Sequence, residues 1–495
     1  MIIAIMVMFV SSLLMVAAFT AANGDIHLSH IDLTQKQAYF AALAGVQEYE
    51  YGLEANPNYW QSCPQPKGSV PGEAAQSYEV TTLPASTDPE TVKVCNSANP
   101  FATIIESKGT LANTFRIKST GKAGTSKRTL IANFQVAGFL NYIYFTQYEV
   151  ADPESYNATT NEQKYCETYR PQREALEARY GSSLRCHYID FGPNDNVNGP
   201  MYTDDRAAVC GGAEFGRAGR EVPDAVEMDL GISLEGCGSG SPKFNTLSGK
   251  PTENSPELVP PESDSSLKAY VEPQNEFTGL TYLVLEGGSD EIKVTQSSGT
   301  RKIKWPKNGL LYVGGSGCGY GEFEQENTDT STTLAKEANC GSVYVKGNYK
   351  QSLTIGAEED LIVNGKITPY GVTPPAAPPG TTTLGLIATR FVRVYHPCSG
   401  GVSGGGPEME NLWIYAAMLS TSHSFLVDNF RCGRSLGNLN VYGAIGQKWR
   451  GIVGLIGTSG YDKEYIYDER LATDEPPYFL APLKAGWKIA RETAP

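Results

Sequence analysis

The first 23 residues of this 495-residue chain contain no charged side chain, and this run constrains the fold more than any other feature. Asp25 is the first acidic residue and Lys36 is the first basic one. As an α-helix rising 1.5 Å per residue, about 22 of these residues would span roughly 33 Å, which is enough to cross a bilayer. Because such a helix is apolar on every side, lipid or neighbouring protein must bury it.

Three interpretations of this run compete: an assembly helix, a simple membrane anchor and a signal peptide. A secretory signal normally starts with basic residues, which are missing here, although the Ala-rich stretch 17–22 resembles a signal-peptidase site. A membrane anchor usually has flanking Lys or Arg, and none occurs before Lys36. We therefore expect the run to be retained as an assembly helix. Its contacts are expected from Met1, Ile2, Ile3, Ile5, Val7, Phe9, Val10, Leu13, Leu14, Val16 and Phe19.

The helix is expected to continue well beyond the apolar run. We predict an N-terminal region 1–56 that is apolar over 1–23 and amphipathic over 30–53, with Pro57 forbidding much further helix. The amphipathic half should lie against its own globular domain. The residues predicted to share one face of this half are Phe40, Leu43, Ala44, Gln47 and Tyr51.

Two further segments complete the first part of the chain. Residues 57–151 contain short β-branched and aromatic runs separated by Gly-rich turns, which predicts a small antiparallel sheet. The most persuasive strand in this segment covers residues 139–150. Residues 152–196 are predicted to be an insertion with a helix at 171–180, closed by a disulfide between Cys166 and Cys186.

Residues 197–495 are expected to form a large all-β domain. Short apolar strands recur there between Gly, Asn, Asp and Pro, with spacings of roughly 8 to 10 residues in places. Stacked as rungs they would build a parallel β-solenoid, and a β-sandwich is the alternative with similar spacing. The predicted fold class is therefore α+β: a long N-terminal α-helix with a small antiparallel sheet, followed by a parallel β-solenoid.

The ten cysteines are even in number and include no C-x-x-C pair, which argues against zinc ribbons and thioredoxin-like chemistry. Taken in consecutive pairs the cysteines are 20 to 34 residues apart, which predicts five local disulfides formed in an oxidising compartment. Sequence does not fix the connectivity, and consecutive pairing is adopted as a guess. The cysteines are Cys63, Cys95, Cys166, Cys186, Cys210, Cys237, Cys318, Cys340, Cys398 and Cys432.

Charge and motif content argue against several other functions. With 54 acidic and 40 basic residues the net charge is −14, so nucleic-acid binding through a generally basic surface is not expected. Adjacent Asp204 and Asp205 would point to opposite faces of a strand, which does not suit a carboxylate pair. A second acidic group is interpreted as a solvated terminal segment and comprises Asp462, Glu464, Asp468 and Glu469. The chain is not expected to be an enzyme or to need a cofactor.

Metal binding has two candidate patterns, and neither is predicted to hold an ion. His27 and His30 lie one helical turn apart, but a surface position beside acidic residues suits them better. The run Asn194-x-Asn196-x-Asn198-Gly199 with Asp205 faintly echoes a calcium loop, but it has Asn at the first ligand and Asp at the last. An Asn-rich turn is the default interpretation.

The N-terminal stretch MIIAIMVMFVSSLLMVAAFTAA, followed by residues 37–45 (QAYFAALAG), resembles the mature N-terminus of bacterial type IV pilin-like proteins. It is most similar to their large minor-pilin-like group, whose helix carries an A-x-x-A-G run near this position. Later phrases resemble large pilus-associated proteins with β-solenoid ends, at residues 198–205, 209–212, 384–388, 446–451 and 460–465. One position departs from the family pattern: typical pilins have glutamate fifth, and this chain has Ile5.

The resemblance implies a structural subunit of an extracellular type IV pilus-like filament. Such a subunit would sit in the inner membrane before assembly, interact with pilus assembly machinery and then form a helical homo-oligomer on the bacterial surface. Without glutamate at position 5, register would depend on side-chain packing, with Ser11 and Ser12 as the only early hydroxyls. Two alternatives remain open: a low-copy tip pilin acting in adhesion, and a surface-anchored polysaccharide-active β-helix enzyme.

Overall fold

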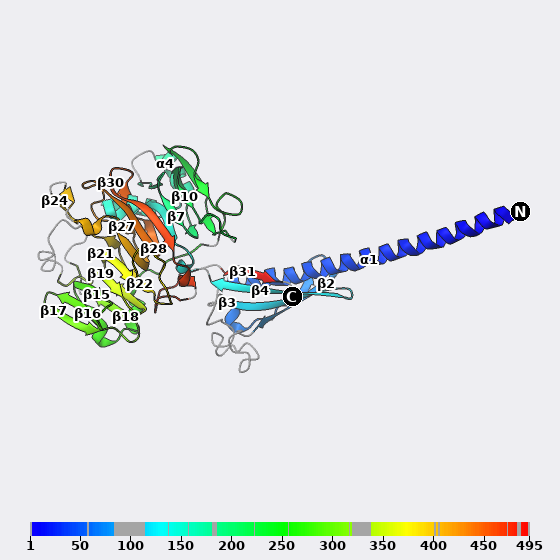
Figure 1. The fold of residues 1–495 in the computed structure, drawn as a ribbon, viewed down its shortest axis with the longest axis horizontal. Helices are drawn as coiled ribbons and strands as arrows, with labels where there is room; N and C mark the ends of the chain where they lie inside the picture. The colour runs from blue at the N-terminus through cyan, green and yellow to red at the C-terminus, as the bar shows by residue number, and fades with distance from the viewer. Residues whose placement is uncertain are drawn as a thin grey trace. The chain divides into compact units, whose positions relative to one another are not determined.

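The computed structural model shows a mixed α+β protein that is mostly β (Figure 1). By contacts the chain divides into two units, Met1–Ala137 with Gly486–Pro495, and Gly138–Ala485. The second unit is thus an insertion in the sequence of the first. The structure describes residues 2–56, 59–83, 114–136, 138–156, 158–180, 186–221, 223–255, 257–315, 317–318, 338–399, 402–403, 406–472, 474–482 and 487–493.

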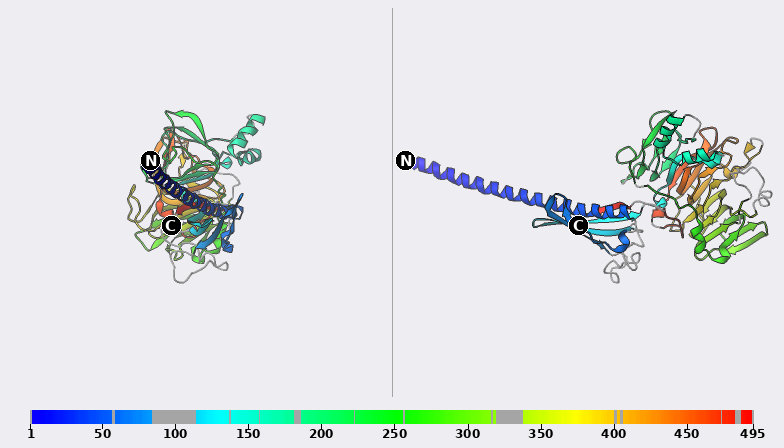
Figure 2. Two further views of the ribbon diagram at one scale, coloured as in Figure 1. Left: turned by 90° about the vertical axis from the view of Figure 1, so that its right-hand side faces the viewer. Right: turned by 180° about the vertical axis from the view of Figure 1, so that it is seen from behind.

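The first unit combines one long helix with an antiparallel sheet. Helix α1 (Ile2–Ala55) is 54 residues long, and its second half lies along one face of the sheet (Figure 2). A 3-10 turn, η1 (Tyr59–Ser62), follows it. The sheet has the order β1 (Lys67–Val70), β2 (Glu73–Leu83), β3 (Thr114–Ala123), β4 (Ser126–Val136) and β31 (Trp487–Thr493). Because β31 pairs with β4, the C-terminal strand completes a sheet begun more than 350 residues earlier.

Small residues let α1 approach the sheet closely. Ala38, Ala41 and Ala42 are fully buried, and the Ser119 hydroxyl donates to the Ala42 carbonyl oxygen at 2.7 Å. A Cβ added to Gly121 would lie 2.1 Å from the Ala38 carbonyl oxygen, so this contact excludes any larger residue there. Aromatic rings pack together in the same core: Tyr49, Trp60, Phe115 and Phe134.

The face of α1 predicted to pack on this domain was partly wrong: half-buried Leu43 packs against the core and Ala44 is half-buried, but the other three residues are exposed. Phe40 is 60% exposed and Tyr51 is 69% exposed, and Gln47 is exposed as well. The buried face instead contains Ala38, Ala41, Ala42, Val46, Tyr49 and Leu53. Large apolar residues misled the prediction, because close helix–sheet contact selects alanine where the backbones approach.

Parallel ladders dominate the second unit. One ladder runs through nine strands, each paired in parallel with the next. Its order is β14 (Glu276–Thr278), β18 (Leu310–Gly314), β20 (Leu353–Ala357), β22 (Leu384–Ala388), β26 (Trp413–Ser420), β28 (Ser435–Arg450), β5 (Tyr144–Ala151), β8 (Met201–Thr203) and β11 (Val226–Met228).

Two further ladders, also parallel, share some of these strands. The second has the order β15 (Thr281–Glu286), β19 (Val343–Tyr349), β21 (Leu361–Pro369), β23 (Val392–Val394) and β27 (Phe425–Val427). The third passes from β21 through β26 and β28 to β30 (Ser459–Tyr467), β7 (Asn196–Asn198), β10 (Glu214–Phe215) and β13 (Lys243–Phe244). A separate parallel sheet holds β6 (Asp190–Phe191), β9 (Ala207–Gly211) and β12 (Ile232–Gly238).

Antiparallel pairing in the second unit is confined, within the described residues, to short additions. β16 (Glu291–Gln296) pairs with β15 and with β17 (Gly299–Lys304). β29 (Gly454–Leu455) pairs with β30, and β24 (Cys398–Ser399) pairs with β25 (Val402–Ser403). Five 3-10 turns that lie outside the insertion complete the unit: η2 (Phe139–Asn141), η4 (Ser265–Ala269), η5 (Pro273–Asn275), η6 (Pro407–Met409) and η7 (Glu469–Ala472).

The core of the second unit consists of side chains stacked in register along each ladder. In the first ladder one uninterrupted row of paired positions is buried. The row is Leu311, Ile355, Leu386, Met418, Ile445, Tyr144, Met201 and Val226. Burying each such side chain contributes about 1.5–3 kcal/mol before the cost of ordering the chain. The short apolar runs in the sequence are therefore layers of one continuous core.

The chain enters this stack in its middle. Tyr144 of β5 pairs with Ile445 of β28, so the first strand of the unit continues the ladder built by the last part of the chain. The predicted boundary at residue 151 was therefore wrong, because strand 139–150 pairs with β28 and β8 rather than with the antiparallel sheet. The predicted 197–495 domain likewise loses its C-terminal strand to the first unit.

The insertion predicted at 152–196 begins as short helical elements. They are η3 (Pro153–Tyr156), α3 (Thr160–Cys166) and α4 (Arg170–Tyr180), and its final residues form β6 and β7. Thr159 caps α3, and its hydroxyl accepts from the Glu162 N–H at 3.4 Å while the Glu162 carboxylate accepts from the Thr159 N–H. A disulfide joins Cys166 to Cys186 and closes the segment.

Four sequence-consecutive cysteine pairs are joined in the structure. Besides Cys166–Cys186 these are Cys210–Cys237, Cys318–Cys340 and Cys398–Cys432. Cys63 is disulfide-bonded, and its predicted partner Cys95 lies outside the described residues. Each joined pair closes a loop of 20 to 34 residues, which in chain-entropy terms is worth about 3 kcal/mol.

Candidate functional site: the exposed apolar half of helix α1

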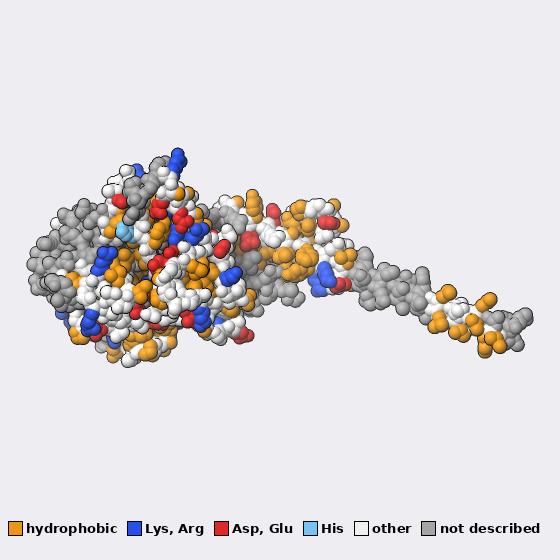
Figure 3. Space-filling view, turned by 90° about the horizontal axis from the view of Figure 1, so that it is seen from above, with side chains coloured by type: hydrophobic (Ala, Val, Ile, Leu, Met, Phe, Trp, Pro, Cys, Tyr) orange, Lys and Arg blue, Asp and Glu red, His pale blue; other side chains and the backbone are white. Residues whose placement is uncertain are grey.

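The first half of α1 exposes apolar side chains. Phe9 is 66% exposed, Leu13 is 55% exposed and Leu14 is 65% exposed. Figure 3 shows hydrophobic side chains gathered along the described part of this half-helix. The exposed set comprises Ile3, Met6, Val7, Met8, Phe9, Val10, Leu13, Leu14, Met15 and Val16, and we call it the apolar half-helix. A contiguous apolar surface of this kind marks a protein–protein or membrane contact.

Seven of the eleven predicted contact residues belong to the apolar half-helix: Ile3, Val7, Phe9, Val10, Leu13, Leu14 and Val16. Met1 and the side chains of Ile2, Ile5 and Phe19 lie outside the described residues. Sequence reasoning missed Met6, Met8 and Met15, although their place in an uncharged run could have identified them. Methionine adapts its shape to irregular neighbours, which suits a packing surface.

The two early hydroxyls are used within the helix. Ser11 donates to the Met8 carbonyl oxygen at 3.0 Å, and Ser12 donates to the Phe9 carbonyl oxygen at 2.9 Å. Each hydroxyl hydrogen is therefore committed to its own backbone. The surface offered to a neighbour is almost purely apolar, so side-chain packing rather than hydrogen bonding would set the register. Among the described residues, no helix combines the length and hydropathy expected of a membrane span.

The acidic residues singled out in the sequence have structural partners. Asp205 is fully buried, forms an ion pair with Arg173 and accepts a hydrogen bond from the Arg170 N–H at 2.6 Å. Asp204 accepts from the Leu258 N–H at 3.1 Å, and burial raises the pKa of its carboxyl to about 8. These two carboxylates therefore have different surroundings and form no catalytic pair with each other.

The second acidic group is not a solvated terminal segment, and that prediction was wrong. Its residues lie in β30 or just after it, within the third ladder. The Glu464 carboxylate accepts hydrogen bonds from the Asn196 and Asn198 amides at 3.2 and 2.8 Å. Asp468 is 5% exposed and forms an ion pair with Arg470 at 2.6 Å. Hydrogen bonds and an ion pair within the protein therefore explain why Glu464 and Asp468 are not free in solvent.

Residues of the candidate calcium loop also have other partners within the protein. Asn196 and Asn198 donate to Glu464, whereas Asp205 pairs with Arg173, so the faint calcium loop is not assembled. Within the described residues the one His/Cys/Asp/Glu group of metal-binding size is Asp190 with Cys210 and Cys237, and those two cysteines form a disulfide. The side chains of His27 and His30 lie outside the described residues.

A buried carboxyl gives the second unit a pH-dependent stability. Asp264 is fully buried and accepts hydrogen bonds at 3.0 Å from the Tyr312 and Thr389 hydroxyls. Burial, with a smaller contribution from the nearby Glu358, raises the pKa of this carboxyl to about 7. Since the folded pKa exceeds the unfolded value near 3.9, its contribution is full below pH 4 and is lost as pH rises through about 7.

Asp264→Asn cannot ionise. We therefore expect its stability relative to the native chain to increase by about 2–3 kcal/mol as the pH rises from 5 to 8. Urea unfolding at both pH values measures this difference. Asp290→Asn is the control, because Lys350 lowers the pKa of that exposed carboxyl and its removal gives no such gain. An identical pH dependence in the native and Asp264→Asn chains would contradict the assignment.

Comparison with known proteins gives a weak structural likeness. No family model matches the chain, and no curated protein matches it. Among solved structures it is similar to the competence-associated pilin ComZ from Thermus thermophilus. The two are 12% identical, the comparison covers 93% of this chain and 97% of that one, and the TM-score is 0.26. Such a score does not establish a common fold.

Proposed function

We propose that this chain is a structural subunit of an extracellular type IV pilus-like filament on the bacterial surface. The observation that carries the proposal is the apolar half-helix, which continues into a helix packed on an antiparallel sheet. Burying seven of its side chains would contribute about 10–20 kcal/mol of gross stabilisation, part of which offsets ordering costs. Head-to-tail contacts among such helices would build a helical homo-oligomer rather than a closed ring.

The second unit is interpreted here as a parallel β-solenoid displayed outside the helical core of the filament. The parallel ladders support this interpretation, as does the row of buried side chains that stays in register across eight strands. A β-sandwich would instead pack two mainly antiparallel sheets face to face. Short strands that cannot bury their own faces gain a continuous core by stacking.

We further propose that the chain is not an enzyme, and that it is anchored in the inner membrane and interacts with the pilus assembly machinery before polymerising. The partners of Asp204, Asp205, Glu464 and Asp468 support a structural role for the acidic residues first considered as catalytic. A low-copy tip subunit acting in adhesion is the alternative, and the number of copies per fibre distinguishes it from a major subunit.

Deletion of residues 1–24 tests the proposal. The truncated chain should remain a soluble monomer, because it keeps the buried half of α1 and loses the apolar half-helix. The full chain should form fibres of regular helical repeat in electron micrographs. Circular dichroism provides the folding control for the truncated chain. Fibres of the same repeat from the truncated chain would overturn the proposal.

A further inference from the structure

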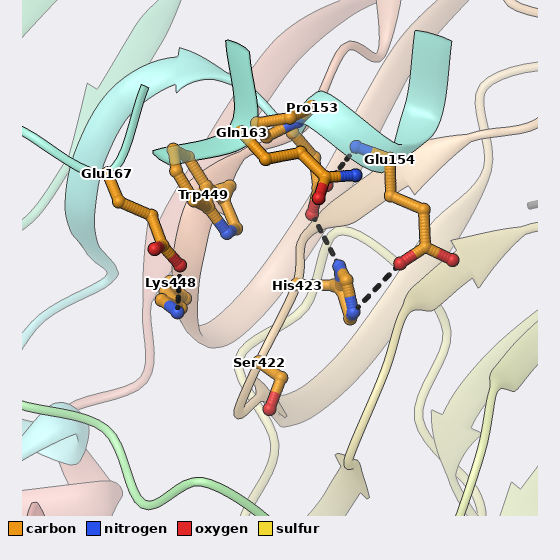
Figure 4. Close-up of a pocket in the computed structure, with 9 residues that line it drawn as sticks. Pro153, Glu154, Gln163, Glu167, Ser422, His423, Lys448 and Trp449 are labelled. Atoms are coloured by element: carbon orange, nitrogen blue, oxygen red, sulfur yellow. Dashed lines mark hydrogen bonds and ion pairs between the residues drawn. The ribbon is translucent and has the colours of Figure 1, made fainter. Parts of the chain in front are cut away.

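A pocket of about 250 Å³ lies in the second unit, between the helical insertion and the strand ladders (Figure 4). On the insertion side its wall includes Glu154 of η3, Gln163 of α3 and Glu167 at the end of α3. On the ladder side it includes His423, just before β27, and Lys448 and Trp449 at the end of β28. At about 30 Å³ per water molecule, the space holds roughly eight waters.

Interactions within the wall fix the charged groups in place. His423 contacts the Asp152 carboxylate through Nδ1 at 3.0 Å and the Glu154 carboxylate through Nε2 at 3.3 Å. Its ring also stacks on Phe391 at 4.5 Å. Across the pocket, Lys448 Nζ lies 3.1 Å from the Glu167 carboxylate. The wall therefore has three carboxylates, one ammonium and one imidazole, and each carboxylate is already paired with Lys448 or His423.

Trp449 is the residue that points to a ligand. It is 4% exposed, and its ring packs on Tyr148 at a centroid distance of 4.7 Å. Within the described part of the chain its indole N–H has no acceptor, and Figure 4 shows the ring nitrogen turned toward the space between Lys448 and His423. Because this N–H is open to the pocket, a group bound there can accept from it in place of water.

The wall chemistry selects the class of ligand. Trp449, Lys448 and the Gln163 amide donate hydrogen bonds, whereas Glu154, Glu167 and the Gln163 carbonyl accept them. An anion would meet three carboxylates. A cation would meet an ammonium and find those carboxylates already paired, and an apolar group would leave the polar wall atoms unsatisfied. Hydroxyl groups both donate and accept, so several on one small ring satisfy both kinds of wall atom. We infer that this pocket binds a single neutral sugar ring.

Titration of the full chain in detergent with neutral sugars tests the inference independently of filament assembly. The neutral probes are the methyl glycosides of D-glucose, D-galactose and N-acetyl-D-glucosamine. D-galacturonate and inorganic phosphate are the anionic probes used for comparison. Saturation-transfer NMR and calorimetry should detect at least one neutral sugar at millimolar concentration. Trp449→Phe removes the indole N–H but keeps an aromatic ring on Tyr148, and we expect about tenfold weaker binding.

Two further variants keep the test decisive. Lys448→Met removes the ammonium from a partly exposed pair with little risk to folding, and it should weaken binding by a similar factor. Trp413→Phe makes the same chemical change at a half-buried ring stacked on Tyr415 in another part of the unit, and binding should stay unchanged. The inference fails if no neutral sugar binds, if only the anions bind, or if Trp413→Phe weakens binding while Trp449→Phe and Lys448→Met do not.

Discussion

Leu13→Asp should raise the subunit concentration needed for filament formation about a hundredfold, whereas Leu247→Asp should leave it unchanged. Both leucines are exposed in the single chain, by 55% and 93%, so neither change should affect folding. Leu13 belongs to the apolar half-helix, and in a filament its side chain would be covered by neighbouring helices. An aspartate there becomes an unpaired charge in apolar surroundings at a cost of about 2.5–3.5 kcal/mol by membrane-insertion scales.

That cost corresponds to a rise of roughly a hundredfold in the subunit concentration needed for assembly. Sedimentation of fibres over a concentration series measures this threshold, with negative-stain microscopy to identify the pellet. Leu247→Asp controls for the added charge because it makes the same change in the second unit. Equal thresholds for both variants would show that the apolar half-helix does not drive assembly.

Arg450→Met should destabilise the second unit by about 3–5 kcal/mol, because it leaves a buried carboxylate without its cation. Arg450 is 1% exposed, and Nη1 lies 2.7 Å from the fully buried Glu149 carboxylate. The guanidinium also lies over the Phe191 ring, 3.6 Å from its centroid. Glu149 accepts additional hydrogen bonds from the Tyr144 and Thr146 hydroxyls, but neither supplies a positive charge.

Urea unfolding followed by near-ultraviolet circular dichroism measures this loss. Combining Arg450→Met with Glu149→Gln should recover most of it, because removing both charges removes the uncompensated one. Arg434→Met is the matched control, since Arg434 forms an exposed pair with Glu410 that is worth at most about 1 kcal/mol. If Arg450→Met destabilised the unit no more than Arg434→Met does, the buried pair would have no special role.

Local sequence patterns predicted the elements whose causes are local. The uncharged run and the helix formers that follow it identify α1, and Pro171 together with the composition of 171–180 identifies α4. The order of the cysteines predicted the four disulfides present in the structure, because each closes a short loop between neighbouring elements. Recurrent short apolar strands predicted a repetitive β unit, since strands of that length cannot bury their faces alone.

Contacts between distant segments were beyond sequence reasoning. The buried face of α1 uses alanine and glycine because a particular sheet approaches it, and hydrophobicity alone favoured Phe40 instead. The pocket beside Trp449 joins residues of the insertion to residues about 250 to 300 positions later. Glu464 resembled part of a solvated segment because its partners Asn196 and Asn198 lie more than 260 residues away.

The sequence by itself determined that this chain has an apolar helix in need of a partner and a β unit built from many short strands. Only the tertiary structure decided the order in which those strands stack. Strand β5 lies in the middle of its ladder and β31 returns to the first sheet, because backbone hydrogen bonds pair any two strands whose edges and buried faces match. Most ladder neighbours follow one another along the chain, but local composition is similar for all these strands and so does not identify the distant pairings of β5 and β31.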